Sequence, residues 1–251
     1  MSPTPLSTMF HRFILLMLPV SALLAGPESA MKLVFEDDFK GDKIDGEKWS
    51  YNSKVVSLGT SPDGTGKATV VNLNIVSRGK PTRWSGSGLG CKFRQPYGYY
   101  EARLRMVQTG GHGCGMGFSI GAPAGKRFPS LSTGFGSGGG DGVGLSFSET
   151  TEMGGRRYNP SPNPVDMKGG VAYKRFNTFG ILFTDKVLSW YINGRQVFRS
   201  DRSKSGGVPG QNVSMSFNHS LPEGGVLKSF PDPTLGPEPF QIDWVKIYKQ
   251  P

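Results

Sequence analysis

A chain of 251 residues is long enough for one well-buried β-sandwich, and its composition argues against several other classes of protein. The formal net charge of +10 favours anionic partners, but no block of five Lys and Arg residues indicates a nucleic-acid-binding surface. The two cysteines, Cys91 and Cys114, allow either one disulfide or two buried thiols. Together with isolated histidines they form no metal-binding pattern, so we expect no metal and no cofactor.

The chain opens with a segment that is typical of secretion signals. An apolar run over residues 13–25 follows a basic residue and ends at the helix-breaking pair Gly26-Pro27. The run is too short to cross a bilayer unaided, because a spanning helix needs roughly 20 apolar residues. We therefore predict a signal peptide over residues 1–30 and a secreted or periplasmic protein without stable membrane insertion.

The cleavage site within this signal stays open between two alanines. Cleavage after Ala30 would put Glu28 where a small residue is preferred, and cleavage after Ala25 would put Leu23 there. The alternative to a signal is an unprocessed tail, with translation starting at Met31. In either case we expect residues 31–251 to form a single domain and a monomer.

Downstream of the signal, short β-rich runs alternate with Gly, Pro, Ser and Asn turns, and no window shows a sustained helical period. So many short strands favour an all-β fold with two packed antiparallel sheets. The expected strands, in chain order, are residues 32–39, 68–78, 87–93, 98–107, 115–120, 143–152, 170–174, 178–184, 187–192, 195–199, 213–218 and 240–248.

Turn residues give the clearest local signals. Asn193-Gly194 supplies the two positive-φ residues of a type I′ hairpin between alternating arms. Residues 130–144 are rich in glycine, and residues 156–165 contain three prolines. We predict both stretches to be loops.

Four segments carry a resemblance to a known family. They read VFEDDFKGDKIDGEKW, SGSGLGCKFRQPYGYYEARLRMV, RFNTFGILFTDKVLSWYINGRQVFR and EPFQIDWVKIYKQ. In this order they resemble glycoside hydrolase family 16 over about residues 32–249. The resemblance implies a concanavalin-like jelly roll, a two-sheet antiparallel β-sandwich whose concave sheet forms the sugar cleft. It also implies a glycosidase that cleaves O-glycosidic bonds of a β-linked glucan or galactan with retention.

Members of this family carry their chemistry on one strand, written E-x-D-x-E, or E-x-D-x-x-E where a β-bulge intervenes. Residues two apart on a strand face the same way, so the carboxylates line up toward the substrate. A retaining pair needs carboxyl groups about 5 to 5.5 Å apart, which this arrangement gives. The strand that resembles it here covers residues 145–152.

This strand departs from the family pattern. In the bulged form Glu152 takes the acid/base position, Glu149 the middle position and Phe147 the position of the nucleophile. In the unbulged form Ser148 takes the position of the nucleophile and Thr150 takes the middle position. Two residues three apart face opposite sides of a regular strand, so a bulge at Thr150-Thr151 is required for both glutamates to reach the cleft. With that bulge, we predict Glu149 as nucleophile and Glu152 as acid/base.

Four further residues are candidates for substrate contacts. Trp84 and Tyr158, both expected in loops, are candidates for stacking on sugars, because HGCGMGFSI lacks the tryptophan that family clefts usually carry there. His112 and Asn218 are candidates for bonding to substrate hydroxyls from strand ends. Asp141 is the alternative carboxylate, although Asp before Gly also suits a turn.

The remaining aromatic and basic candidates have simpler interpretations. Trp49, Trp190 and Trp244 lie in segments that resemble the family core, so we expect them to be packing residues. Arg103 and Arg105 alternate on one strand face, which fits either an acidic sugar or an ordinary solvated surface.

Three functions remain open from the sequence. The first is an endo-acting glycosidase, and the second is a non-catalytic carbohydrate-binding sandwich with a degenerate active site. The third is a wall or matrix protein held by charge, whose binding would weaken with salt. In each case the expected partner is a polysaccharide, neutral or anionic.

Overall fold

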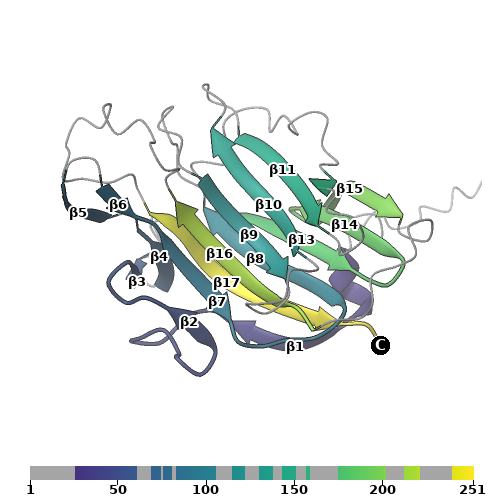
Figure 1. Ribbon diagram of the computed structural model, residues 1–251. Helices are drawn as coiled ribbons and strands as arrows, with labels where there is room; N and C mark the ends of the chain where they lie inside the picture. Colours follow the sequence, from purple (N-terminus) through teal and green to yellow (C-terminus); the bar gives the residue numbers. More distant parts are fainter. Residues whose placement is uncertain are drawn as a thin grey trace, which may run out of the picture.

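The described residues form two antiparallel sheets that pack on each other and a small separate ribbon (Figure 1). In this part of the chain the helical element is one 3₁₀ turn, η2 (Pro27–Ala30). None of its helices has the length and apolarity that a membrane span requires. The predicted two-sheet β-sandwich is therefore confirmed. The computed structural model describes residues 26–60, 69–74, 76–80, 83–105, 115–121, 130–137, 143–150, 157–158, 175–201, 212–220 and 239–251.

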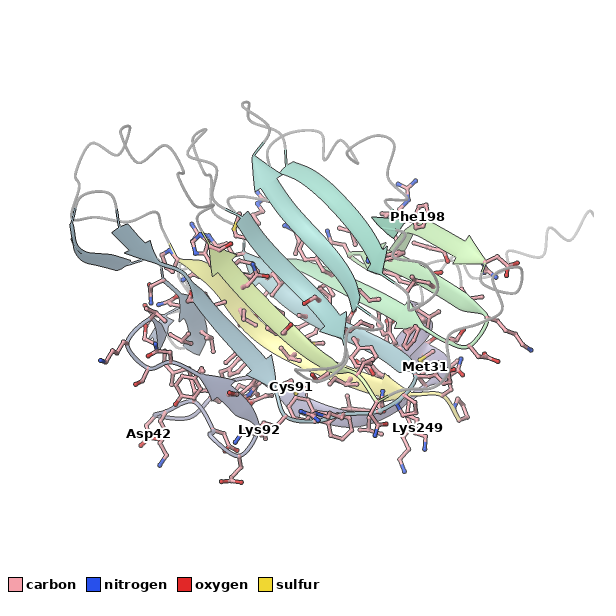
Figure 2. All side chains as sticks on the ribbon, viewed as in Figure 1. Met31, Asp42, Cys91, Lys92, Phe198 and Lys249 are labelled. Carbon is pink, nitrogen blue, oxygen red and sulfur yellow. The ribbon has the colours of Figure 1, made fainter. Side chains whose placement is uncertain are left out.

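The eight-stranded sheet has the strand order β15-β14-β13-β8-β17-β4-β3. Strand β4 pairs with the first half of β17 and β1 pairs with its second half. Figure 2 shows Met31 and Lys249 at the end of the sheet where β1 begins and β17 stops. The strands are β1 (Lys32–Asp37), β3 (Val56–Thr60), β4 (Thr69–Leu73), β8 (Gly98–Arg105), β13 (Asn177–Phe183), β14 (Val187–Ile192), β15 (Arg195–Asp201) and β17 (Phe240–Lys249).

The seven-stranded sheet has the strand order β12-β11-β10-β9-β16-β7-β2. Its strands are β2 (Trp49–Tyr51), β7 (Ser87–Cys91), β9 (Gly115–Gly121), β10 (Ser130–Ser137), β11 (Val143–Thr150), β12 (Arg157–Tyr158) and β16 (Ser214–Ser220). The separate ribbon pairs β5 (Val76–Lys80) with β6 (Arg83–Ser85).

The prediction of a loop over residues 130–144 is wrong, because β10 occupies the first half of that stretch. β10 pairs along its length with β9 on one side and with β11 on the other. Glycine weakens an isolated strand, but hydrogen-bonded neighbours on both sides outweigh that local preference. The alternation of Leu131, Thr133 and Phe135 was the signal for a strand.

Other strands differ from the prediction in detail. β2 and β3 were not predicted, and the expected strand over residues 68–78 is divided between β4 and β5. The expected strand over residues 170–174 lies outside the described residues.

The predicted hairpin is confirmed at the turn between β14 and β15. Asn193 has a φ of 49° and Gly194 a φ of 76°, and Ile192 pairs directly with Arg195 across the turn. The Asn193 side chain accepts a hydrogen bond from the Thr178 backbone at 2.9 Å. It also donates one to Asn177 Oδ1 at 3.0 Å, so the turn is fastened to β13.

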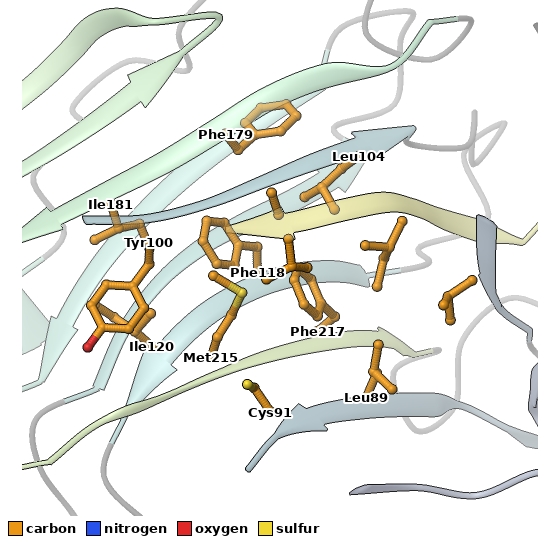
Figure 3. Packing of buried hydrophobic residues seen from close by; sticks show 14 of the residues in the cluster. Leu89, Cys91, Tyr100, Leu104, Phe118, Ile120, Phe179, Ile181, Met215 and Phe217 are labelled. Atoms are coloured by element: carbon orange, nitrogen blue, oxygen red, sulfur yellow. The ribbon is translucent and has the colours of Figure 1, made fainter. Parts of the chain in front are cut away.

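The core lies between the two sheets and consists of the inward residues of both (Figure 3). The rings of Phe118 and Phe217 stack with their centroids 5.5 Å apart. Trp49 and Trp190 are buried, as predicted. Trp244 is instead half-buried, and the Lys246 ammonium group lies 5.1 Å from its ring centroid. The expectation that Trp244 is a core residue is wrong, because the bulge between Ile242 and Trp244 shifts the alternation of β17.

Cys91 is a free thiol packed in this core, whereas Cys114 lies outside the described residues. Burial raises the pKa of the Cys91 thiol to about 11. Of the two alternatives that the sequence left open for Cys91, the structure therefore has the buried thiol.

We predict that Gly180→Ala destabilises the protein while Gly46→Ala does not. A methyl group at Gly180 would clash with the phenol group of Tyr99, which is fully buried, whereas one at Gly46 would meet open space. The first change should lower the free energy of unfolding by about 1 to 3 kcal/mol, and the second by less than about 0.5 kcal/mol. Urea unfolding of the two variants measures this, and equal losses would contradict the packing described.

Candidate functional site

The seven-stranded sheet has two alternating sets of positions, and its register assigns each residue to one of them. Cross-strand partners lie on the same face of a sheet, and successive residues of a strand lie on opposite faces. Phe217 pairs with both Leu89 and Phe118, and all three are buried in the core. We call the rows that contain such residues the core rows, and the rows that alternate with them the outer rows.

The outer rows of β16, β9, β10 and β11 consist of serine, glycine, threonine and asparagine. No Asp or Glu occupies an outer-row position of these four strands over their described lengths. In the order of the strands, the rows are Ser216, Ser119, Ser132 and Ser148; Asn218, Gly117, Gly134 and Ser146; Ser214, Gly121, Ser130 and Thr150; and Ser220, Gly115, Gly136 and Gly144.

Side chains on β9 and β16 show how the outer rows are arranged. The hydroxyl oxygens of Ser119 and Ser216 are hydrogen-bonded to each other at 2.8 Å. The exposed side chain of Asn218 lies over Gly117, where an added methyl group would clash with its amide. These residues present hydroxyl and amide groups close to the backbone of the sheet. Such groups both donate and accept hydrogen bonds, as sugar hydroxyls do.

Glu149, the predicted nucleophile, belongs to a core row by register. It pairs with Leu131, which pairs with Ile120, which pairs with Met215. Ile120 and Met215 are fully buried. The pairing of β10 with β11 is regular from Val143 to Thr150, so the bulge required by the catalytic pair would have to follow Thr150.

The same register also assigns the residues that the bulged and unbulged forms place at the catalytic positions of β11. Phe147 stands in the core row of Phe118 and Phe217, whereas Ser148 and Thr150 stand in outer rows. The described part of β11 is therefore regular, as in the unbulged form, in which Ser148 and Thr150 take two of the three carboxylate positions.

The other predicted site residues are widely separated. Tyr158 pairs directly with Glu149, because it lies on β12, and Trp84 pairs with Ser77 in the separate ribbon. The expectation that both aromatics lie in loops is therefore wrong, because each joins a short two-stranded pairing. Asn218 lies on the same sheet as Glu149, three strands away. Glu152, His112 and Asp141 lie outside the described residues.

Arg103 and Arg105 lie on β8 of the other sheet and already have protein partners. Arg103 forms an ion pair with Asp243, and its guanidinium lies 5.0 Å from the ring centroid of Phe176. Arg105 donates a hydrogen bond to Gln241 Oε1 at 2.9 Å. Both arginines therefore belong to a polar network on the eight-stranded sheet.

Comparison with known proteins identifies the fold. No family model and no curated protein matches the sequence. Solved structures do match it. One is a glycoside hydrolase family 16 endo-glucanase from Bacteroides ovatus in complex with G4G3G-2F-DNP. Its TM-score is 0.59 at 18% identity, and the match covers 85% of this chain and 99% of that one. SCLam, a non-specific endo-β-1,3(4)-glucanase from family GH16, has a TM-score of 0.65 and 15% identity, covering 90% and 94%.

The chain has the glycoside hydrolase family 16 fold. The laminarinase from Rhodothermus marinus is also similar, with a TM-score of 0.63 and 16% identity, covering 87% of this chain and 97% of that one. Identities this low concern architecture, and the chemistry must be argued from residues. The sequence did not predict the outer rows of this family 16 fold, because β10 was interpreted as a glycine-rich loop.

This chain also has buried ionisable groups away from the outer rows. His219 is fully buried, and its Nδ1 lies 2.9 Å from the Leu73 carbonyl oxygen. Burial lowers the pKa of this histidine, so it stays neutral in the core. Among the described residues, no three His, Cys, Asp or Glu side chains gather in a way that could hold a metal ion.

A buried carboxyl group lies on the eight-stranded sheet. Glu101 is 7% exposed and accepts a hydrogen bond from Tyr99 at 3.1 Å. Burial is the main cause that raises the pKa of Glu101 to about 7. The Tyr99 hydrogen bond opposes that rise, the nearby Glu28 adds to it and Lys246 opposes it. We call Tyr99, Glu101, Tyr191 and Tyr248 the tyrosine–glutamate cluster, because the rings of Tyr191 and Tyr248 both contact the ring of Tyr99, which donates to this carboxyl group.

We predict that Glu101 contributes a loss of stability as pH rises from about 4.5 to above 7, which the neutral burial of His219 opposes in the same pH range. The folded state holds the Glu101 proton up to pH about 7, whereas an ordinary Glu loses it near 4.5, so folding binds a proton in that window. The loss should reach roughly 3 kcal/mol at most. Urea unfolding of the wild type and of Glu101→Gln at pH 5 and pH 8 measures it, and the loss with pH should be smaller in the variant than in the wild type. An unchanged slope in that variant would assign the effect to another group.

Proposed function

We propose that the protein recognises a β-linked glucan or galactan on the outer rows of the seven-stranded sheet. The observation that carries this proposal is the composition of the outer rows on β16, β9, β10 and β11, which offer hydroxyl, amide and backbone groups without a carboxylate. The family 16 fold supports the substrate class, because structures of that fold include glucanases solved with glucan ligands.

The geometry of the outer rows suits an extended polar polymer. Neighbouring strands lie about 4.8 Å apart, so the row from Ser216 to Ser148 extends across three spacings, or about 14 Å. The hydroxyl groups of Ser119 and Ser216 in this row can each donate and accept hydrogen bonds. Glycines in the adjacent rows allow a ligand to approach the backbone closely.

The formal net charge supports anionic members of this substrate class. A charge of +10 raises the local concentration of anionic polymers, and salt screens that attraction. Retaining hydrolysis needs two carboxyl groups about 5 to 5.5 Å apart, which the described outer rows do not supply. Recognition without bond cleavage is therefore the function that the geometry of the described residues supports best.

We predict that Ser119→Tyr abolishes glycan binding while Ser57→Tyr leaves it unchanged. Ser119 stands in the middle of an outer row, where a bulky ring would hold a polymer away from the sheet. Ser57 is an exposed serine on β3 of the other sheet, so it is the matched control. Affinity electrophoresis in laminarin, mixed-linkage glucan and agar should show at least a tenfold loss for the first variant.

The thermal transition of each variant checks that it remains folded. Equal binding by wild type and a folded Ser119→Tyr variant would contradict the outer rows as the binding surface. Failure of the wild type to bind any β-linked polymer would refute the proposal itself.

Hydrolysis with retention is the second candidate, and the likeness to endo-glucanases favours it. Glu149 lies near the end of β11 and pairs with Tyr158 on β12, and Glu152 follows it three residues later in the sequence. A bulge after Thr150 would bring the two glutamates to one side of the strand. Glu149 would then be the nucleophile and Glu152 the acid/base, with Trp84, His112, Tyr158 and Asn218 as substrate contacts.

If the wild type releases reducing ends, we predict that Glu152→Gln lowers the rate by at least a thousandfold. The change removes the proton donor with little change in volume. Glu149→Gln should be as severe, because it removes the nucleophile, and Glu47→Gln at an exposed position should have no effect. A reducing-sugar assay on glucans, agars and carrageenans measures this. Activity that survives both changes would move the site to another carboxylate, with Asp141 the first to test.

A further inference from the structure

The first described residues of the chain lie against the tyrosine–glutamate cluster of the eight-stranded sheet. Gly26 is buried, and Ser29 donates from its backbone and its hydroxyl to the Gly26 carbonyl oxygen, at 3.3 and 3.0 Å. The charge of Glu28 acts on Glu101 and on Tyr99, which are themselves hydrogen-bonded. Residues 26–31, the N-terminal segment, are therefore part of the folded structure, although the signal was predicted to extend to residue 30.

One oxygen atom of this segment lacks a partner. Glu28 Oε2 is buried and accepts no hydrogen bond. The Glu28 carboxylate folds back onto Gly26, where a side chain would clash with both of its oxygens. A buried carboxylate oxygen without a donor is costly, so this position calls for a hydrogen-bond donor close to Gly26.

Among the described residues, the charged groups that act on Glu101 are one carboxylate, that of Glu28, and one ammonium group, that of Lys246. The carboxyl groups of Glu28 and Glu101 interact, and Lys246 is the cation that acts on Glu101 among the described residues. The Lys246 ammonium is also bound to Glu36, with its Nζ 3.3 Å from Glu36 Oε1. Arg199 is a further cation, which acts on Tyr191 of the cluster. Neither cation is bound to the buried Glu28 oxygen, so this carboxylate is the group with which one more positive charge would pair.

We infer that the chain is processed by hydrolysis of the Ala25–Gly26 bond, and that the new α-ammonium group of Gly26 binds the Glu28 carboxylate. Hydrolysis consumes one water molecule and leaves a carboxylate on Ala25 and an ammonium group on Gly26. That ammonium is one bond from the Gly26 Cα, against which the unpartnered Glu28 oxygen lies. Its three donors and its charge supply what Glu28 lacks. The inference is independent of glycan recognition.

Processing at the other predicted site would have a different consequence. Cleavage after Ala30 would remove Gly26 and Glu28 together, and with them the carboxylate whose charge acts on Tyr99 and Glu101. Both of these residues are at most 7% exposed in the presence of the segment. Gly26 is itself buried, so it is packed as part of the fold, which favours Gly26 over Met31 as the first residue.

The terminus is tested first on the full-length chain. The protein is expressed from Met1 in a secreting bacterial host, and the exported product is analysed by intact mass and N-terminal sequencing. We expect a chain that begins at Gly26. A terminus at Met31, a terminus upstream such as Leu23, or an intact Met1 would each overturn the inference.

The ion pair is tested on the same exported protein. The pKa of the α-amino group is measured from the pH dependence of its acylation, read on the N-terminal peptide by mass spectrometry. Pairing with Glu28 should raise it by about one unit above the ordinary value near 8. Glu28→Gln should return it to that value, and Glu47→Gln, at an exposed position outside the N-terminal segment, should not. An unshifted wild-type value would overturn the pairing, whether or not the variants fold.

Discussion

The unbroken antiparallel register from β16 through β9 and β10 to β11 decides what each face of the seven-stranded sheet contains. Because side chains alternate with a period of two, a slip of one residue would exchange every core position for an outer one. Stacking of Phe118 on Phe217 between the sheets holds this register, since a slipped pairing would expose both rings. The position of Glu149 in a core row and of Ser148 in an outer row follows from this one constraint.

The fold was largely predictable from the sequence, because it depends on signals that act locally. Alternating strands and the Asn193-Gly194 turn are such signals, and both are present in the structure. β10 was not predictable in this way, since its glycines favour a loop until β9 and β11 pair with it. The faces of β11 were ambiguous for a related reason: Glu149 and Glu152 are three residues apart, and the sequence alone does not place a bulge.

The two sheets use their outward positions in different ways. On the eight-stranded sheet these positions are occupied by large groups that bond to one another, including Arg103 with Asp243 and Tyr99 with Glu101. Gly180 leaves the space that Tyr99 fills, and the N-terminal segment lies against the same cluster. On the seven-stranded sheet the outer rows hold small polar residues. Aromatic and charged groups therefore bond to one another on one face, whereas the other face has small polar residues at its outer-row positions.

The small side chains of the outer rows also affect the entropy of binding. Immobilising a long, flexible side chain in an interface costs about 0.5 to 1.5 kcal/mol, whereas glycine has no rotamer freedom to lose. The hydrogen bond between Ser119 and Ser216 restrains two hydroxyls before any ligand arrives. A polymer bound here would meet a nearly rigid surface, so its affinity should increase with the number of sugar units in contact, at little conformational cost to the protein.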